Sequence, residues 1–364
     1  MCTRVLYVDQ SKPPEERPED RPDCNVITGR NMDWAQTTYS DFWAFPVGMK
    51  RVGLVCDKEE LMKPDHLPFN PFEWTSKYGS VIVSAYDAST TDGMNTEGLM
   101  ANLLFLSVSE YPKSQGLDEK LLSAGAWPQY LLDTCATVQE AVDTMRSLKD
   151  KKIRIKTSKV PGRDSDAGLH VCVSDKTGDS AIFEYRNGEL DIHHGREYTV
   201  MTNNPFYDQQ LAMNEYWQYK NSQYGDGGIL TLPGTNLPED RFARASGYLS
   251  KVSHNNFGNP RRATATTLSI VRNASVPLGL TNEKNPFISS TIWSTVADHR
   301  NLIYYFSNVL SPSLCWVEIK KLNLEEGSGV RKIPLEENFK LGGDVTDKFE
   351  PAEPFEFTCE PKLS

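Results

Sequence analysis

The sequence predicts an α+β protein in which two β-sheets stack on each other and helices cover both outer faces. Blocks of strand-forming residues open the chain, recur in its middle and return in its last third, and helical segments separate these blocks. Two of the strands are apolar almost throughout, which is typical of strands covered on both faces. No repeat or linker interrupts the pattern, so residues 2–364 are expected to form a single domain.

The first two strands are expected to form a hairpin with a long tip. The opening CTRVLYV is rich in β-forming residues, and residues 25–34, NVITGRNMDW, resume that character. Residues 10–24 between them are proline-rich and charged, which predicts an exposed loop. Residues 78–87 and 98–107 are the two nearly continuous apolar strands.

Helices are predicted next, at residues 120–135 and 138–148, where apolar residues recur at helical spacing. Thr137 and Glu140 form a capping box at the start of the second helix. Further strands are predicted at 168–174, 180–186, 189–193 and 197–202, helices at 205–220, 239–251 and 263–273, and closing strands at 290–297, 301–307 and 314–320. From about residue 344 we expect a surface tail.

Composition excludes several classes of partner. The formal net charge is -10, which argues against a nucleic-acid partner because such a partner requires a basic face. No apolar run approaches the ~18 residues of a membrane-spanning helix, so no membrane partner is expected. The N-terminal MCTRVLYVDQ reaches polar residues too early for a secretory signal. As written, the sequence predicts a cytoplasmic protein, or a periplasmic one if a signal was removed before the numbering began.

The seven cysteines do not suggest a metal site or a disulfide scaffold. Their number is odd, their spacing is wide and no C-x-x-C pair occurs. We interpret the six beyond Cys2 as small core residues: Cys24, Cys56, Cys135, Cys172, Cys315 and Cys359.

Common catalytic motifs are missing from the sequence. It contains no phosphate-binding loop, dinucleotide fingerprint, H-E-x-x-H or G-x-S-x-G. The adjacent His193 and His194 would point to opposite faces of a strand, so they are better explained as solvated turn residues than as metal ligands. An enzyme with this sequence would therefore work without a histidine base.

Cys2 offers an alternative base. Methionine before a small residue is normally removed, which would leave a thiol and a free α-amine on one residue. An α-amine has an unperturbed pKa of ~7.7–8.0, so it can accept the thiol proton near neutral pH. Such a residue is an activated nucleophile without a separate histidine. A cysteine at the second position also occurs by chance, so the motif alone is weak.

Five segments strengthen this interpretation because of their order and spacing. They are MCTR, GRNMDW, DGMNTEGLMANLLFL, TNNPFYDQQ and LPGTN followed by EDRFARAS. In these segments the chain resembles the choloylglycine hydrolase family, which contains penicillin V acylases and bile salt hydrolases. The tryptophan after MD and the NLLFL sequence are more similar to the branch typical of Gram-negative bacteria. The resemblance extends from Cys2 to about Lys321.

The resemblance implies a four-layer αββα sandwich, the N-terminal-nucleophile hydrolase fold, and cleavage of a linear amide through a thioester. It implies a small-molecule N-acyl amide as substrate, no cofactor or metal, and a homo-oligomer, either tetramer or dimer. Penicillin V is the favoured substrate, with conjugated bile salts and N-acyl homoserine lactones as alternatives. Two rival hypotheses are an inactive acyl-ligand binding protein on the same fold and an acid ceramidase-like amidase.

The family pattern also implies roles near the nucleophile. Cys2 matches the nucleophile, and Arg30 and Asp33 match the arginine and aspartate beside it. A guanidinium near the sulfur favours the thiolate, and a carboxylate can hold the α-ammonium. Strict alternation sends Arg30 and Asp33 to opposite faces of a strand, so the strand is expected to bend or bulge for both to reach Cys2. The structural alternative is a surface ion pair, worth at most about 1 kcal/mol.

Further roles follow from the later segments. Asn203 matches the side chain of the oxyanion hole, the backbone N–H of Phe105 matches its second donor, and Arg241 matches the last arginine of the family. A turn before a helix would equally explain Asn203, and a helix cap or ion pair would explain Arg241. Trp34 and Tyr86 are candidates for an apolar acyl pocket, with core packing as their alternative.

The sequence departs from the family in two loops. Residues 10–24 are longer than the family pattern suggests, and the stretch between TNNP and LPGTN is shorter than in Gram-positive bile salt hydrolases, where it forms an assembly loop. Both differences bear on the oligomer and leave the chemistry unchanged.

Overall fold

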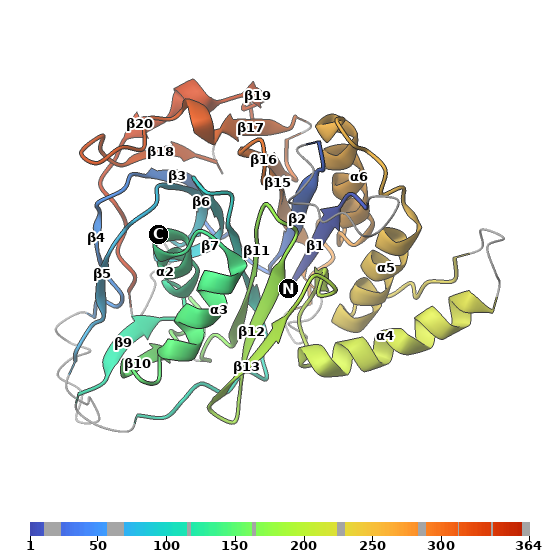
Figure 1. The fold of residues 1–364 in the computed structure, drawn as a ribbon, viewed down its shortest axis with the longest axis horizontal. Helices are drawn as coiled ribbons and strands as arrows, with labels where there is room; N and C mark the ends of the chain where they lie inside the picture. Colours follow the sequence, from blue (N-terminus) through green and yellow to red (C-terminus); the bar gives the residue numbers. More distant parts are fainter. Residues whose placement is uncertain are drawn as a thin grey trace.

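The computed structural model describes residues 1–10, 23–56, 69–114, 118–161, 165–223, 230–282, 289–311, 313–335 and 338–358. Within these ranges the chain forms two large sheets with helices outside them (Figure 1). The predicted α+β sandwich of two stacked, mainly antiparallel sheets is therefore confirmed. The tip predicted at 10–24 lies largely outside the described residues.

The first sheet has seven strands and carries the N-terminus. In spatial order they are β14 (Val200–Met201), β1 (Cys2–Val8), β2 (Val26–Asp33), β15 (Thr291–Asp298), β16 (Ile303–Asn308), β17 (Cys315–Glu318) and β19 (Gly343–Asp344). As predicted, β1 and β2 pair as an antiparallel hairpin, with Cys2 opposite Met32. Met32 in turn lies opposite Trp293 of β15. The starts of β1 and β15 therefore lie at the same end of the sheet, on either side of the end of β2.

The second sheet has nine strands. Their spatial order is β13 (Glu189–His194), β12 (Ser180–Arg186), β11 (Leu169–Ser174), β8 (Met100–Phe105), β7 (Ser89–Asn95), β6 (Ser80–Ala85), β3 (Asp41–Phe45), β18 (Arg331–Pro334) and β20 (Glu350–Pro351). Two small sheets pair β4 (Lys50–Val52) with β5 (Glu73–Thr75) and β9 (Lys120–Ser123) with β10 (Ile153–Lys156).

The helices cover the two sheets from outside (Figure 1). The second sheet contacts α2 (Trp127–Thr134) and α3 (Val138–Ser147), and the first contacts α5 (Pro238–Lys251) and α6 (Pro260–Asn273). Helix α4 (Tyr207–Ser222) packs on α5 and extends away from the body, and η2 (Ile319–Lys321) and η3 (Thr346–Lys348) are single 3₁₀ turns. No helix in the described ranges is both long enough and apolar enough to cross a bilayer.

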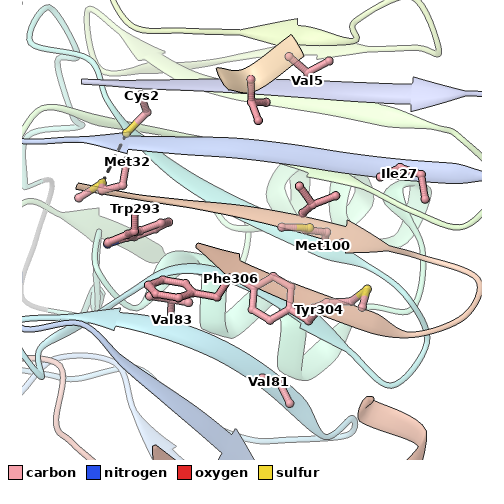
Figure 2. Close-up of a cluster of buried hydrophobic side chains, with 14 of the residues drawn as sticks. Cys2, Val5, Ile27, Met32, Val81, Val83, Met100, Trp293, Tyr304 and Phe306 are labelled. Carbon is pink, nitrogen blue, oxygen red and sulfur yellow. Dashed lines mark hydrogen bonds between the residues drawn. The ribbon is translucent and has the colours of Figure 1, made fainter. Parts of the chain in front are cut away.

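Strand alternation divides the apolar residues between two cores. Val81 and Val83 of β6 face the first sheet, whereas Ile82 between them faces α2 and α3. Figure 2 shows the inter-sheet core, in which Trp293 and Phe306 of the first sheet lie over Val83. Both sides of β6 are therefore buried, as its continuous apolar sequence predicts.

Several predicted elements differ from the structure. The helix predicted at 120–135 is wrong in its first half, where β9 pairs in parallel with β10 and only Trp127–Thr134 is helical. Strand β7 was not predicted because its sequence STTDGMN is polar, although most of it is buried. The histidine pair lies on β13 with both side chains half-buried, and His194 pairs with Asp179.

The cysteines bear out the core interpretation with one exception. Among the described residues Cys24, Cys135, Cys172 and Cys315 are buried free thiols. Cys56 is disulfide-bonded, so the interpretation is wrong there. The odd count and wide spacing of the cysteines could not reveal this bridge. Cys359 lies outside the described residues.

From Gly343 on, the chain supplies β19 and β20 and buries Val345 and Phe357.

Candidate active site

Cys2 lies at the start of β1, where the two sheets and α5 converge. Its residue is only 2% exposed, yet its side chain lines a cavity of about 100 Å³. The sulfur faces the thioether of Met32 across the strand pair, with 3.6 Å between the two sulfur atoms (Figure 2). Cys2 therefore lies at the wall of a cavity.

Arg30 approaches the sulfur of Cys2 from between the sheets. Its Nη2 lies 3.2 Å from Cys2 Sγ and donates to the carbonyl of Leu103 at 2.8 Å. Burial lowers the pKa of Arg30, but the facing Cys2 and Asp92 outweigh burial and raise it overall. The guanidinium is therefore a permanent positive charge beside the sulfur, which favours the ionised thiol.

Asp33 and Arg241 lie on the other face of the first sheet, against the main chain of Cys2. Arg241 Nη1 donates to the carbonyl of Cys2 at 2.6 Å and lies 3.5 Å from Asp33 Oδ2. Thr291 donates to Asp33 Oδ1, whereas Oδ2 accepts no hydrogen bond in the structure. Burial lowers the pKa of Arg241. Asp33 thus keeps a buried carboxylate oxygen available to a further donor.

The expected bend of β2 is not needed to bring Arg30 and Asp33 to Cys2. Strand β2 keeps a continuous register with β1, and the irregularity lies in β15, between Thr291 and Trp293. Cys2 is the first residue of β1; its side chain lies on one face of the sheet, and Arg241 contacts its carbonyl from the other. Arg30 therefore meets the sulfur and Asp33 lies near the main chain.

Asn203 connects the nucleophile to the second sheet. Its Oδ1 accepts from the main-chain N–H of Cys2 at 2.8 Å and from Arg241 Nη2 at 2.7 Å, and its Nδ2 donates to the carbonyl of Phe105 at 2.6 Å. Leu106 donates its N–H to the carbonyl of Gly168, in the loop before β11. Consecutive residues of a strand point their main-chain N–H and C=O groups to opposite sides, so those of Phe105 point away from β11. They point toward Asn203, which contacts the Phe105 carbonyl.

The two aromatic candidates both line the cavity at Cys2. Trp34 Nε1 donates to the hydroxyl of Tyr86 at 2.8 Å, and its ring meets the edge of Phe105 at 5.6 Å between centroids. Tyr86 has a φ of 56°, so its backbone is left-handed in the turn between β6 and β7. The rest of the wall is mostly small or apolar and includes Ala85, Ala88, Leu103, Gly125, Val160 and Leu169. A larger hollow of about 890 Å³ beside α4 and α5 contains none of the predicted site residues.

Met1 is fully buried over the site. Its amine donates to the carbonyl of Asp33, and its carbonyl accepts from the N–H of Asp33 at 2.8 Å. Burial lowers the pKa of this amine. With Met1 attached, the nitrogen of Cys2 is an amide and cannot act as a base; without Met1 the same atom becomes an amine beside Asn203.

Sequence reasoning missed several residues in contact with the site. Trp293 places its ring 4.9 Å from the Arg30 guanidinium, and Asp92 forms an ion pair with Arg30 at 3.3 Å. His170 contacts the residue before Asn203. One of its ring nitrogens lies 2.8 Å from a Glu184 carboxylate oxygen, and the other lies 3.1 Å from the carbonyl oxygen of Thr202. Asp92 belongs to the DGMN segment, but the sequence does not reveal what it contacts.

These groups can together support acyl transfer. The sulfur is held beside a cation, the nitrogen of the same residue is held by Asn203, and the cavity offers an apolar space for an acyl chain. Among the described residues no cluster of three or more His, Cys, Asp or Glu side chains is arranged to hold a metal ion.

Comparisons with known proteins show which proteins this chain is similar to. The sequence profile of the linear amide C-N hydrolases of the choloylglycine hydrolase family matches residues 19–334. A penicillin V acylase from Pectobacterium atrosepticum is 43% identical over 98% of this chain and 92% of its own length. The solved penicillin V acylase from Agrobacterium tumefaciens is 41% identical, with a TM-score of 0.80 over 98% of this chain and 99% of that chain.

A more distant structure shares the fold. A variant of the conjugated bile acid hydrolase from Clostridium perfringens is 20% identical, with a TM-score of 0.70 over 92% of this chain and 97% of that chain. The family profile spans most of the sequence, and the two acylases cover nearly all of it. The chain belongs to the choloylglycine hydrolase family of linear amide C-N hydrolases.

Proposed function

We propose that this protein hydrolyses a linear N-acyl amide through Cys2 in the manner of a penicillin V acylase. The observation that carries the proposal is the position of the Cys2 sulfur, which is 3.2 Å from Arg30 Nη2 and at the wall of an apolar cavity. Nucleophilic catalysis requires an activated sulfur with a substrate site in front of it, and both features meet at this residue.

Removal of Met1 is the first requirement of the mechanism. It converts the Cys2 nitrogen from an amide into an α-amine that can accept the thiol proton. Asn203 Oδ1 is 2.8 Å from that nitrogen, and Asp33 Oδ2 accepts no hydrogen bond, although Arg241 Nη1 lies 3.5 Å away. Because Met1 is fully buried, we expect its removal before the N-terminus packs into the fold.

Acylation and deacylation then use the same amine twice. The amine takes the thiol proton, the sulfur adds to the amide carbon, and the resulting ammonium protonates the leaving nitrogen as the C–N bond breaks. Water next gives a proton to the amine while its oxygen attacks the thioester, which releases the acid and regenerates the thiol. The Asn203 Nδ2 and the Phe105 N–H are the proposed donors to the oxyanion, and one such donor is worth ~2.7–4 kcal/mol in the transition state.

Substrate preference is proposed from the cavity and the relatives. A space of about 100 Å³ between Trp34, Tyr86 and Gly125 suits a compact aromatic acyl group such as phenoxyacetyl. Two penicillin V acylases at 43% and 41% identity favour the same acyl group. Conjugated bile salts are the second candidate because a bile acid hydrolase shares the fold, and N-acyl homoserine lactones remain a third.

The test is hydrolysis of penicillin V, glycine- and taurine-conjugated bile salts and long-chain N-acyl homoserine lactones by the purified protein. Cys2→Ala is expected to abolish turnover with the fold retained, and Cys315→Ala is the matched control because it removes another buried thiol, one that does not line the cavity. Turnover by Cys2→Ala at the native rate contradicts the mechanism. Binding of these ligands without turnover by a protein lacking Met1 favours the inactive binding protein.

The compartment is proposed from Cys56. Disulfides persist in oxidising compartments, so the bonded Cys56 favours the periplasmic alternative over the cytoplasm. Alkylation of intact cells before lysis, followed by mass mapping of Cys56, tests this. A fully alkylated Cys56 in the native protein favours the cytoplasm. The homo-oligomer stays a prediction.

A further inference from the structure

We propose that Asp92 is a positioning residue that fixes the Arg30 guanidinium against the sulfur of Cys2. This inference rests on the proposed function, because it assigns Arg30 the task of favouring the thiolate. Asp92 does not contact the sulfur itself. It would act by determining where the positive charge beside the sulfur lies.

Asp92 is fully buried in β7 and gathers donors from both sheets. Its Oδ2 accepts from Arg30 Nη1 at 3.3 Å and from Asn102 Nδ2 at 2.7 Å. Its Oδ1 accepts from the hydroxyls of Thr295, at 3.2 Å, and Tyr304. Four donors, from strands of both sheets, thus fix the carboxylate between the sheets.

The ionised form of Asp92 is the one that matches these partners. Burial raises the pKa of Asp92 and outweighs Arg30, Tyr304 and Asn102, which act in the opposite direction, so the hydrogen-bond donors alone indicate the ionised form. The guanidinium of Arg30 and the amide nitrogen of Asn102 can only donate, so the Asp92 Oδ2 that they share must accept twice and has no room for a proton. Asp92 therefore supplies the countercharge that a fully buried guanidinium needs.

The Arg30 guanidinium is held at its two ends. Nη1 donates to the carbonyl of Thr91 at 2.7 Å and to Asp92. Nη2 is shared among the carbonyl of Leu103, the Cys2 sulfur and, at 3.3 Å, the Met32 sulfur. Its Nε has no hydrogen-bond partner. Without Asp92, the Nη1 end keeps only one acceptor, so the plane of the guanidinium can tilt and its Nη2 can leave the sulfur.

A purely structural role for Asp92, in which it only joins the two sheets, makes a different prediction. In that case replacing Asp92 would lower kcat by the same factor with or without Arg30, so the losses in kcat from the two substitutions would multiply. A positioning residue has nothing left to position once the guanidinium is gone. A double-mutant cycle between Asp92 and Arg30 therefore separates the two roles.

The experiment compares Asp92→Asn, Arg30→Lys and the double variant, with kcat and KM measured on phenoxyacetyl p-nitrophenyl ester, an activated substrate that keeps weak variants measurable. We expect Asp92→Asn to lower kcat by about 100-fold, the loss typical of a displacement near 1 Å, with KM within about threefold. In the Arg30→Lys background the same change is expected to lower kcat by less than about threefold. Multiplicative losses in the double variant would overturn the proposal.

Two further variants keep the test decisive if Asp92→Asn does not fold. Asn102→Ala removes the donor on the oxygen that faces Arg30, and Tyr7→Phe, the matched control, removes a donor from another buried aspartate, Asp9. We expect a clear kcat loss for Asn102→Ala that disappears in the Arg30→Lys background, and near-native kcat for Tyr7→Phe. Equal losses for both variants, persisting in that background, would overturn the proposal. Turnover by Cys2→Ala would instead refute the proposed function.

Discussion

Replacing Asn203 with Asp tests the oxyanion hole with the smallest possible change of shape. The substitution keeps Oδ1, which accepts from the nitrogen of Cys2 and from Arg241, and exchanges the Nδ2 donor for a second acceptor. That new oxygen would lie about where Nδ2 now lies, 2.6 Å from the carbonyl oxygen of Phe105. The variant therefore loses the proposed donor to the oxyanion and gains a repulsive contact.

The size of the effect follows from the donor that is lost. One oxyanion donor contributes ~2.7–4 kcal/mol, which corresponds to about 10²- to 10³-fold in kcat. Arg241 Nη2, 2.7 Å from Oδ1, compensates part of the new buried charge, so we expect the variant to fold. Because the interaction is made mainly in the transition state, KM should stay within about threefold of its native value.

Asn204→Asp is the matched control. Asn204 accepts from the N–H of Ser107 at 2.9 Å and contacts the Ser107 hydroxyl at 2.8 Å, and a carboxylate can accept both bonds. Steady-state hydrolysis of penicillin V by the two variants, with thermal unfolding as a check of the fold, gives the comparison. A folded Asn203→Asp enzyme that keeps more than a tenth of the native kcat would refute the assignment of Asn203.

Three further predictions concern the cavity, the sheet–helix contact and pH. Ala88→Leu should fill the acyl cavity and raise KM for penicillin V by roughly tenfold or more, measured by initial rates; an unchanged KM would place the acyl group elsewhere. Gly29→Ala should lower the free energy of unfolding by about 1–3 kcal/mol in urea titration, since its Cβ would lie 2.9 Å from Thr267 and 3.0 Å from Val271. A smaller loss would mean that α6 can shift. Burial lowers the pKa of His299 below 6.5, so stability present above pH 6.5 should decline on acidification by at most about 1.4 kcal/mol per pH unit. The decline should be weaker in His299→Gln, and identical pH profiles would contradict it.

The sequence predicts the elements whose apolar pattern is regular. The β1–β2 hairpin, both buried strands of the second sheet and the helices at 138–148 and 239–251 lie where periodicity places them. The adjacent apolar residues Leu121 and Leu122 show no strand-like alternation, so periodicity predicts a helix where β9 lies. Strand β7 was missed because Thr91, Asp92 and Asn95 are polar and are buried only through hydrogen bonds.

The residues of the candidate site likewise fall into those that the sequence identifies and those that it does not. Cys2, Arg30, Asp33, Asn203 and Arg241 lie in short segments whose order identifies the family, and the structure gathers them within hydrogen-bonding or ion-pair distance of one another. The partners that organise them are not visible in sequence. The donors on Asp92 lie between 10 and 212 residues away along the chain, so only the folded sheets bring them together.

The most direct test is the intact mass of the enzyme quenched in acid during penicillin V turnover, followed by mapping of its N-terminal peptide. We predict a chain that begins at Cys2 and carries one phenoxyacetyl group on that residue. An active enzyme that retains Met1, or an acyl group attached to another residue, would contradict the account.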